Sequence, residues 1–274
     1  MIPIYVISLD RSHRFKRLSK DLHEQGLKFE TIRALNGRNL SREFLDANVD
    51  KRSSYARLGY VMSPALIGCA LSHQLAYTKG LEENQSWIIV LEEDVRLLSD
   101  FEKHIETIVR NLDECNPYVC QLFTRGERFI CNNSIEKIEE DRFLFNFAIP
   151  PGQTAGYLIN REALLIAKSE EKLSGPPDWP NWSHSVSFVG TFPYLISETG
   201  EDTSIGSPPM NRVDYWLRNL LKLLTFHFFR YHKSYPNIRS YYLFEIKPLF
   251  LRFKWKLKGG PTLPSGDTSG LWIS

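Results

Sequence analysis

The most constraining feature of this sequence is an apolar run, residues 87–91 (WIIVL), that leads directly into the acids Glu92, Glu93 and Asp94. The run is rich in β-branched residues and predicts a strand buried on both faces, as in α/β sheets. Three adjacent carboxylates repel one another unless a cation neutralises them. Glu92 and Asp94 at a strand end suit a hard divalent ion, Mn²⁺ or Mg²⁺, as metal ligands. The alternative is a solvated acidic turn that opens the next helix.

Apolar periodicity along the chain alternates between strand and helix patterns. Strands are predicted at 2–8, 29–34, 87–91, 118–123, 143–148, 153–159 and 191–196. Helices are predicted at 14–25, 65–79 and 101–112, and from Arg161 onward. This alternation predicts an α/β fold with a mostly parallel central sheet flanked by helices.

The net charge of +2 conceals an uneven distribution along the chain. Residues 211–258 hold eleven Lys and Arg against two acids (11 − 2 = +9), whereas residues 1–210 hold 23 against 29 (23 − 29 = −6). We therefore expect a main domain at 1–210 and a basic helical extension at 211–258. The remainder, 259–274, is rich in Gly, Pro, Ser and Thr and is expected to be a disordered tail.

The four cysteines lack the paired close spacing of a zinc site, which predicts free thiols in a cytosolic protein. Residues 1–3 lead directly into an apolar strand without a basic leader, so no secretory signal is expected. No uncharged apolar stretch is long enough to predict a membrane-spanning helix.

Five short signatures occur in a fixed order along residues 2–205. They are 3–11 (PIYVISLDR) with Arg14, 34–37 (ALNG), 68–73 (GCALSH), 91–94 (LEED) and 155–159 (AGYLI). Together they resemble glycosyltransferase family 25, the bacterial lipooligosaccharide β-galactosyltransferase group, which is related to collagen galactosyltransferases. The resemblance implies a GT-A-like fold, a nucleotide-sugar donor, a divalent ion and inversion at the anomeric carbon. The family usually has Glu-Asp-Asp where this chain has Glu92-Glu93-Asp94, and the Glu92-x-Asp94 pair stays aligned with its metal motif.

A second group of residues is expected to bind the donor: Leu9, Arg14, Ala34, Asn36, His73 and Glu93. A guanidinium such as that of Arg14 forks well onto phosphate oxygens, although a surface arginine on a helix is the alternative. Ala34 and Asn36 follow the second strand, where GT-A-like folds form part of the nucleotide pocket. His73 belongs to the family pattern, but a lone histidine in an apolar helix is also typical of a hydrogen-bonded core residue.

Inversion in one step needs a carboxylate that removes the proton of the acceptor hydroxyl. Asp178 is the predicted catalytic base, because it lies between prolines and the aromatic residues Trp179 and Trp182, whose faces suit sugar rings. A turn aspartate that caps its own backbone is the structural alternative. The acids at 198–202 are a rival source of the base.

The basic extension 211–258 also carries thirteen aromatic residues. Aromatic and basic side chains together suit the headgroup region of an anionic membrane. Single-stranded nucleic acid is the rival partner, but no nucleic-acid motif accompanies the pattern, so none is expected. A helical subdomain whose aromatic residues pack on the sheet is the third interpretation.

The sequence thus predicts a metal-dependent inverting glycosyltransferase that moves a hexose, galactose from UDP-galactose, onto a lipid-linked lipooligosaccharide core. We expect it in the cytoplasm, peripheral on the inner face of the bacterial inner membrane. Two alternatives remain: transfer of another sugar, such as glucose or an N-acetylhexosamine, to a capsule or protein acceptor, or a non-catalytic glycan- or membrane-binding protein of the same fold.

Overall fold

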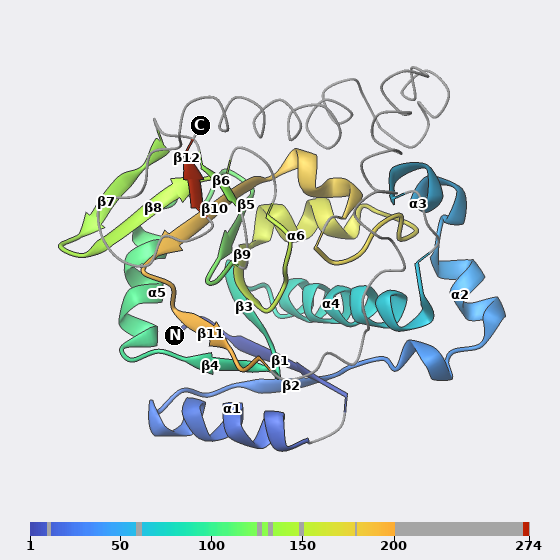
Figure 1. Cartoon of the computed structure of the whole chain (residues 1–274), viewed down its shortest axis with the longest axis horizontal. Helices are drawn as coiled ribbons and strands as arrows, with labels where there is room; N and C mark the ends of the chain where they lie inside the picture. Colours follow the sequence, from blue (N-terminus) through green and yellow to red (C-terminus); the bar gives the residue numbers. More distant parts are fainter. Residues whose placement is uncertain are drawn as a thin grey trace.

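The computed structural model describes residues 1–9, 12–58, 62–124, 128–130, 134–147, 151–178, 180–200 and 271–273. These residues form an α/β fold in which a central sheet carries helices on both faces (Figure 1). The predicted extension 211–258 and most of the predicted tail 259–274 lie outside the described residues. The assignment of those two segments stays a prediction.

The elements lie close to the predicted ranges. The described helices are α1 (His13–Glu24), α2 (Arg42–Asn48), α3 (Lys51–Leu58), α4 (Pro64–Glu82), α5 (Phe101–Arg110) and α6 (Arg161–Lys168), with 3₁₀ turns at Gly37–Asn39 and Asn181–Ser185. The described strands are β1 (Ile4–Ser8), β2 (Glu30–Arg33), β3 (Trp87–Glu92), β4 (Val95–Leu97), β5 (Tyr118–Gln121), β6 (Arg128–Ile130), β7 (Glu136–Glu139), β8 (Arg142–Asn146), β9 (Gly156–Asn160), β10 (Ser187–Phe192), β11 (Ile196–Glu198) and β12 (Leu271–Ile273).

The central sheet has eight strands in the order β2-β1-β3-β9-β5-β10-β8-β7. Strands β2, β1, β3, β5, β10 and β7 point the same way, whereas β9 and β8 run in the opposite direction. The α/β fold with a mostly parallel central sheet flanked by helices, expected from the sequence, is confirmed. The carboxyl ends of β1, β2 and β3 consequently meet at one edge of the sheet.

The acid-terminated strand β3 is buried on both faces, as its sequence predicts. Ile89 and Leu91 pack in one hydrophobic cluster with α1 and α5, while Ile88 and Val90 pack in the other with α4 and α6. Successive side chains of a strand point to opposite faces, so each residue of the run enters one of the two cores. Its neighbours β1 and β9 hold this strand on either side.

Helix α4 carries one of the predicted signatures and begins where local chemistry favours a helix. The Ser63 side chain accepts a hydrogen bond from the Leu66 N–H, and Pro64 occupies the first helical turn, where its missing N–H costs nothing. The helix lies beside α6 against the sheet (Figure 1). Its face toward the sheet includes His73, Ala76 and Tyr77, all buried.

The predicted last strand at 191–196 is wrong in its bounds. The structure forms β10 from Ser187 to Phe192 and resumes with β11 at Ile196. Pro193 explains the break, since it has no N–H to offer the sheet. The sequence patterns also missed the short elements α2, α3, β4, β6, β7 and β12, and β12 lies in the segment predicted to be a disordered tail.

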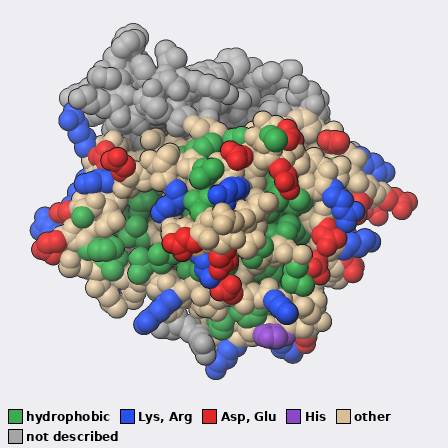
Figure 2. Space-filling view, turned by 180° about the vertical axis from the view of Figure 1, so that it is seen from behind, with side chains coloured by type: hydrophobic (Ala, Val, Ile, Leu, Met, Phe, Trp, Pro, Cys, Tyr) green, Lys and Arg blue, Asp and Glu red, His purple; other side chains and the backbone are tan. Residues whose placement is uncertain are grey.

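No helix of the described residues is long and apolar enough to cross a membrane. Figure 2 shows acidic and basic side chains interspersed over the described part of the face opposite to that of Figure 1. That face shows no broad patch of one charge. The basic character predicted to contact a membrane is that of residues 211–258 in the sequence.

Candidate active site

The three acids form the turn that joins β3 to β4. Glu92 is the last residue of β3, and Val95 begins β4. Glu92 is in register with Ile7 of β1, and Ser8 of β1 is in register with Arg33 of β2. The acids therefore lie at the common carboxyl edge of three parallel strands, where open α/β sheets bind ligands.

A cavity of about 150 Å³ opens at this edge. Seven of the nine predicted site residues line it: Leu9, Arg14, Ala34, Asn36, Glu92, Glu93 and Asp94. The remaining two are not part of its lining: His73 Nε2 lies 3.4 Å from Glu92 Oε1, and Asp178 contacts the same Thr154 hydroxyl as Glu92. The structure thus brings all nine predicted residues to one place, although the role of each stays a prediction.

One wall of the cavity forms where the backbone of the loop after β2 packs directly against the backbone of α4. A Cβ on Gly37 would lie 1.6 Å from the carbonyl oxygen of Pro64, and a Cβ on Gly68 would lie 2.4 Å from that of Leu35. Ser72 Oγ fixes this contact, because it accepts from the Leu35 N–H at 2.9 Å and donates to the Gly68 carbonyl at 2.6 Å. The glycines of two sequence signatures are therefore needed for the approach of loop and helix.

Glu93 differs from the two acids beside it because its oxygens are already engaged. Glu93 Oε1 lies 3.0 Å from Arg14 Nη2, and Ser8 Oγ donates to Glu93 Oε2. The residue is buried. Glu93 therefore holds Arg14 at the cavity, and a direct contact of Glu93 with a donor stays a prediction.

Asp94 is the acid with the least compensation. Its Oδ1 is buried and has no hydrogen-bond partner among the described residues. Burial, followed by the charges of Glu92 and Glu198, raises the pKa of Asp94 to about 6. A buried carboxylate oxygen without a donor is unfavourable unless a ligand or cation satisfies it.

Glu92 and Asp178 share a single hydroxyl group. Thr154 Oγ1 lies 2.6 Å from Glu92 Oε1 and 3.3 Å from Asp178 Oδ1. Burial alone would raise the pKa of Glu92, but His73 and Thr154 bring it below its usual range. Burial and the charge of Glu92 raise the pKa of Asp178 to about 6. Two neighbouring carboxyls thus have separated pKa values, which is typical of acid–base sites.

Gln153, which is not expected from the sequence, and Glu198, one of the rival acids, complete this side of the site. Gln153 has a backbone φ of 110° and donates from Nε2 to Glu198 Oε1 at 2.7 Å. The Gln153 N–H also donates to Asp178. A non-glycine residue at such a φ is strained, and strain of this kind is common beside functional groups. Glu198 therefore belongs to the site, whereas Glu201 and Asp202 lie outside the described residues.

Trp182 does not take the role predicted for it. It is buried and packs edge-on against Tyr77, with ring centroids 6.1 Å apart. The 3₁₀ turn Asn181–Ser185 directs the indole into the core between α4 and α6. A sugar could not stack on it, and the other predicted aromatic, Trp179, lies outside the described residues.

Comparison with known proteins shows the family to which this chain belongs. Residues 1–169 match the family described as "Glycosyltransferase family 25 (LPS biosynthesis protein)". The chain belongs to glycosyltransferase family 25. The resemblance seen in the sequence signatures is thereby confirmed, and the match includes eight of the nine predicted site residues, all but Asp178.

Individual relatives share only a low sequence identity with this chain, and over only part of it. Procollagen galactosyltransferase 2 from Homo sapiens is 29% identical over 116 residues, 40% of this chain and 18% of the human protein. A Haemophilus influenzae protein that carries a glycosyltransferase name is 27% identical over 157 residues, 57% of this chain and 52% of that protein. An inactive family member from Mus musculus is 26% identical over 113 residues, 40% of this chain and 19% of its own length. The matches thus span about a fifth of the animal proteins and half of the bacterial one.

The side chains of this family 25 site offer two ligand sets for a metal ion, and both include Glu92. Ligand atoms of Cys69, His73 and Glu92 lie within 4.8 Å of one another, a mixed set that suits zinc. The oxygen set of Glu92 and Asp94 suits Mn²⁺ or Mg²⁺. The oxygen set fits better, because both acids line the cavity and Asp94 Oδ1 has no partner, whereas His73 does not line it.

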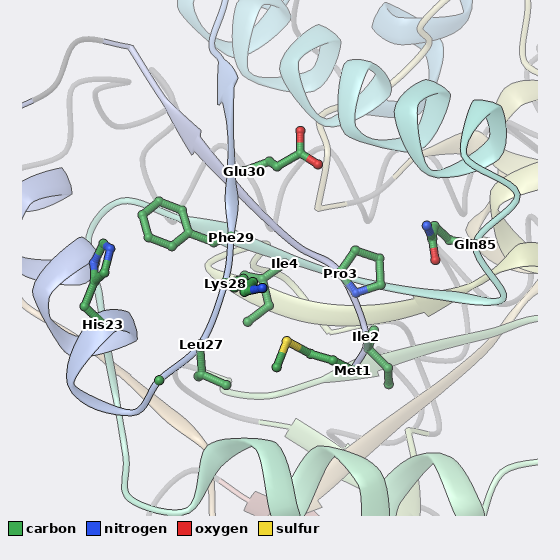
Figure 3. A pocket seen from close by; sticks show the side chains of 11 residues that line it. Met1, Ile2, Pro3, Ile4, His23, Leu27, Lys28, Phe29, Glu30 and Gln85 are labelled. Carbon is green, nitrogen blue, oxygen red and sulfur yellow. The ribbon is translucent and has the colours of Figure 1, made fainter.

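A larger hollow of about 730 Å³ lies elsewhere, between the start of β1 and the segment that enters β2. Figure 3 shows Met1, Ile2, Leu27 and Phe29 around it, with Glu30 as its acid. No cluster of acids and no predicted residue lines this hollow. It is therefore not the candidate active site.

Proposed function

We propose that this chain is a metal-dependent inverting hexosyltransferase that transfers galactose from UDP-galactose to a lipooligosaccharide core glycan. The observation that carries the proposal is the cavity where Glu92 and Asp94 meet Arg14, with Asp178 one hydroxyl group away from Glu92. Membership of family 25 supports glycosyl transfer, and the name of the human relative supports galactose.

The donor would bind along the lining of the cavity. Leu9, Ala34 and Asn36 offer an apolar and backbone-rich wall suited to the nucleoside. The ion pair to Glu93 engages Nη2 of Arg14, and the other N–H groups of the guanidinium can meet diphosphate oxygens. Arg14 would thereby stabilise the negative charge that develops on the leaving diphosphate.

Glu92 and Asp94 would hold a divalent cation, Mn²⁺ or Mg²⁺, at the same edge of the cavity. When bound, such an ion supplies neutralisation of the diphosphate without any proton transfer. Its binding also relieves the repulsion between the two carboxylates. The uncompensated Oδ1 of Asp94 supports this assignment.

Asp178 would act as the base. Its carboxylate removes the proton of an acceptor hydroxyl, the hydroxyl oxygen bonds to the anomeric carbon, and the bond from that carbon to the diphosphate breaks. Attack from the face opposite the leaving group inverts the configuration. A pKa of about 6 leaves Asp178 ionised at neutral pH and able to accept a proton.

The basic extension supports the proposed acceptor and location of the reaction. A lipid-linked oligosaccharide is anchored in a membrane, and the cations and aromatic residues of 211–258 suit an anionic membrane surface. The enzyme would accordingly act in the cytoplasm, peripheral on the inner face of the bacterial inner membrane. Nucleic acid is not among the proposed partners.

Two alternatives differ in measurable ways. Another hexose, or a capsule or protein acceptor, would leave the chemistry of the site unchanged. A non-catalytic protein is the second alternative, and the inactive mouse relative shows that the family contains such members. Donor hydrolysis without acceptor separates the two, since a catalytic site cleaves UDP-sugars slowly and a binding protein does not.

The proposal is tested by thermal unfolding with a panel of nucleotide sugars, with and without Mn²⁺. A ligand that binds only the folded protein raises its apparent stability. UDP-galactose with Mn²⁺ is expected to give the largest increase in Tm. A larger increase in Tm with UDP-glucose or a UDP-N-acetylhexosamine would identify that sugar nucleotide as the donor in place of UDP-galactose. No increase with any nucleotide sugar would contradict the proposal.

A further inference from the structure

A buried hydrogen-bond chain lies directly behind Glu92. Tyr77 Oη lies 2.7 Å from Tyr157 Oη, and Tyr157 Oη lies 2.8 Å from His73 Nδ1. On the other side of the imidazole ring, His73 Nε2 lies 3.4 Å from Glu92 Oε1. His73 is 1% exposed, and its Nε2 has no hydrogen-bond partner of good geometry among the described residues, so the 3.4 Å contact with Glu92 Oε1 is its polar contact on that side.

The direction of this chain follows from matching each proton with an acceptor. Tyr77 can donate to Tyr157, Tyr157 to His73 Nδ1, and His73 Nε2–H to Glu92. If Nδ1 carried a proton instead, Tyr157 would have to donate to Tyr77. The Tyr77 proton would then have no acceptor among the described residues, which is unfavourable for a buried hydroxyl.

Two donors converge on the same oxygen of Glu92. Thr154 Oγ1 lies 2.6 Å from Oε1, and His73 Nε2 approaches Oε1 from within α4. No described donor meets Oε2 of this carboxylate. With Oε1 held on two sides, the orientation of the carboxylate is fixed and Oε2 is left for a ligand in the cavity.

We propose that Tyr77 and Tyr157 fix the proton of His73 on Nε2 and, through His73 and together with Thr154, hold Glu92 with Oε2 toward a bound divalent cation. This inference rests on the proposed function, because it requires Glu92 to be a cation ligand. His73 and Tyr157 are then positioning residues that do not touch the donor. Groups behind a metal ligand commonly set its orientation and affinity.

The chain explains why two distant signatures occur together. His73 belongs to the signature 68–73 on α4, and Tyr157 belongs to the signature 155–159 on β9. Their rings stack with centroids 5.7 Å apart and 22° between planes. Phenylalanine at 157 would keep this stacking and remove only the hydroxyl, which makes it a selective probe.

The first test examines the chain itself. Nitrogen NMR of the full-length protein with ¹⁵N-labelled histidine reports which ring nitrogen carries the proton, and His73→Gln identifies the signal. Near neutral pH we expect Nε2 of His73 to be protonated and Nδ1 to be unprotonated. A protonated Nδ1 would overturn the proposed direction of the chain.

The second test examines the consequence for the cation. Tyr157→Phe is expected to weaken Mn²⁺ binding about tenfold and, at saturating Mn²⁺, to lower kcat by a similar factor with KM for UDP-galactose unchanged within about twofold. Mn²⁺ binding without donor is measured by electron paramagnetic resonance of the free ion. Tyr118→Phe removes a half-buried phenol elsewhere and is the matched control, expected to equal wild type. Equal Mn²⁺ affinity in Tyr157→Phe and wild type would overturn the inference.

A third comparison separates positioning from packing. The amide nitrogen of Gln can replace Nε2 of His73, whereas that of Asn corresponds to Nδ1. We expect His73→Gln to retain most Mn²⁺ binding and His73→Asn to lose at least about tenfold, at similar Tm. Equal losses in the two variants would contradict a positioning role.

Failure of the proposed function gives a different result. Glu92→Gln should abolish Mn²⁺ binding if Glu92 is a ligand. Unchanged binding in Glu92→Gln would remove the proposed cation site, and with it the consequence claimed for Tyr157. The NMR result on His73 would still decide the direction of the chain independently.

Discussion

Two clusters of charged side chains in this molecule differ in how fully hydrogen bonds and ion pairs satisfy their charges. The structural cluster joins α5, β7 and β8: Arg142 Nη1 donates to Thr191 Oγ1 at 3.1 Å and to the Pro193 carbonyl at 2.7 Å. Glu139 accepts from Thr107 and contacts His104. At the site cluster, the described groups that face Glu92, Asp94 and Asp178 include the Thr154 hydroxyl, the His73 ring, the Gln153 N–H and the ion-paired Arg14.

The difference separates groups that hold the fold from groups that await a partner. In the structural cluster each buried charge meets donors or acceptors, so removal of one leaves the others unsatisfied. In the site cluster burial and the charge of Glu92 raise the pKa of Asp94 and of Asp178, and an oxygen of Asp94 has no partner among the described residues. Substitutions in the first should affect stability, and substitutions in the second should affect activity.

The largest effect is expected at the base. Asp178→Asn keeps the shape of the side chain but cannot accept a proton, so kcat should fall about 1,000-fold, within the range for loss of a general base. UDP-galactose affinity should stay within a few-fold of wild type, because the base acts on the acceptor. Steady-state kinetics with calorimetric donor binding checks both. Loss of donor binding would place Asp178 in the donor pocket and favour Glu198 as the base.

The structural cluster gives the reverse result. Arg142→Met removes a buried cation and leaves the Pro193 carbonyl without its donor, so the free energy of unfolding should fall by about 3 kcal/mol. Transfer activity per folded molecule should equal that of wild type. Urea unfolding and kinetics below the transition measure the two quantities. A stable but inactive Arg142→Met would refute the separation of the clusters.

The cation site comes next. Asp94→Asn removes one anionic ligand and should lower Mn²⁺-dependent transfer about 100-fold, equivalent to about 2.7 kcal/mol. Without Mn²⁺ the variant should be at least as stable as wild type, because the repulsion from Glu92 and Glu198 is relieved. Thermal unfolding in EDTA provides the control. Near-normal turnover in this variant would show that Asp94 is not a ligand.

The raised pKa of Asp178 predicts how the rate depends on pH. Below about pH 6 the protonated carboxyl cannot act as a base, so kcat should fall about tenfold per pH unit. The effect on stability has the opposite sign. A carboxyl whose pKa is higher in the folded state binds more protons there than in the unfolded state. Its contribution to the free energy of unfolding therefore declines as pH rises from about 4 to about 6. A flat kcat profile between pH 5 and pH 8 would exclude Asp178 as the base.

The smallest effect on catalysis is expected from the basic extension. Deletion of 211–274 should abolish binding to anionic vesicles and leave transfer to a soluble oligosaccharide close to that of the full chain. High salt should release only part of the bound full-length protein, since screening weakens charge contacts but not aromatic burial. Co-sedimentation with neutral and anionic vesicles measures this. Equal binding to both would reject the electrostatic part, and an insoluble truncation would show that 211–258 packs on the core.

The sequence predicted well those features that depend on local pattern. The continuous apolar run 87–91 specified β3, because this strand is buried on both faces. The helical spacing of apolar residues in 101–112 specified α5, because one face of this helix is buried. Residues that follow the ends of β1, β2 and β3 could be placed together, since parallel strands share a carboxyl edge. The strand-edge argument applies to Glu92, Asp94, Ala34 and Asn36, whereas the family resemblance indicated Leu9, Arg14 and Glu93; all seven line the cavity.

Features that depend on contacts between distant segments could not be predicted. The hydroxyl of Thr154 joins Glu92 to Asp178 only because β9 pairs with β3 and the loop at 178 folds back. Trp182 appeared suited to sugar binding, but a 3₁₀ turn places it in the core. The spacing of apolar residues within one segment predicts neither arrangement.

The central claim is that the carboxylates at the end of β3 require a cation before the donor diphosphate can bind. Isothermal titration of UDP into wild type and Asp94→Asn, each with Mn²⁺ and with EDTA, tests it most directly. We expect UDP to bind wild type with Mn²⁺, and to bind at least about tenfold more weakly in the other three mixtures. Equally tight binding of UDP to wild type in EDTA would contradict it.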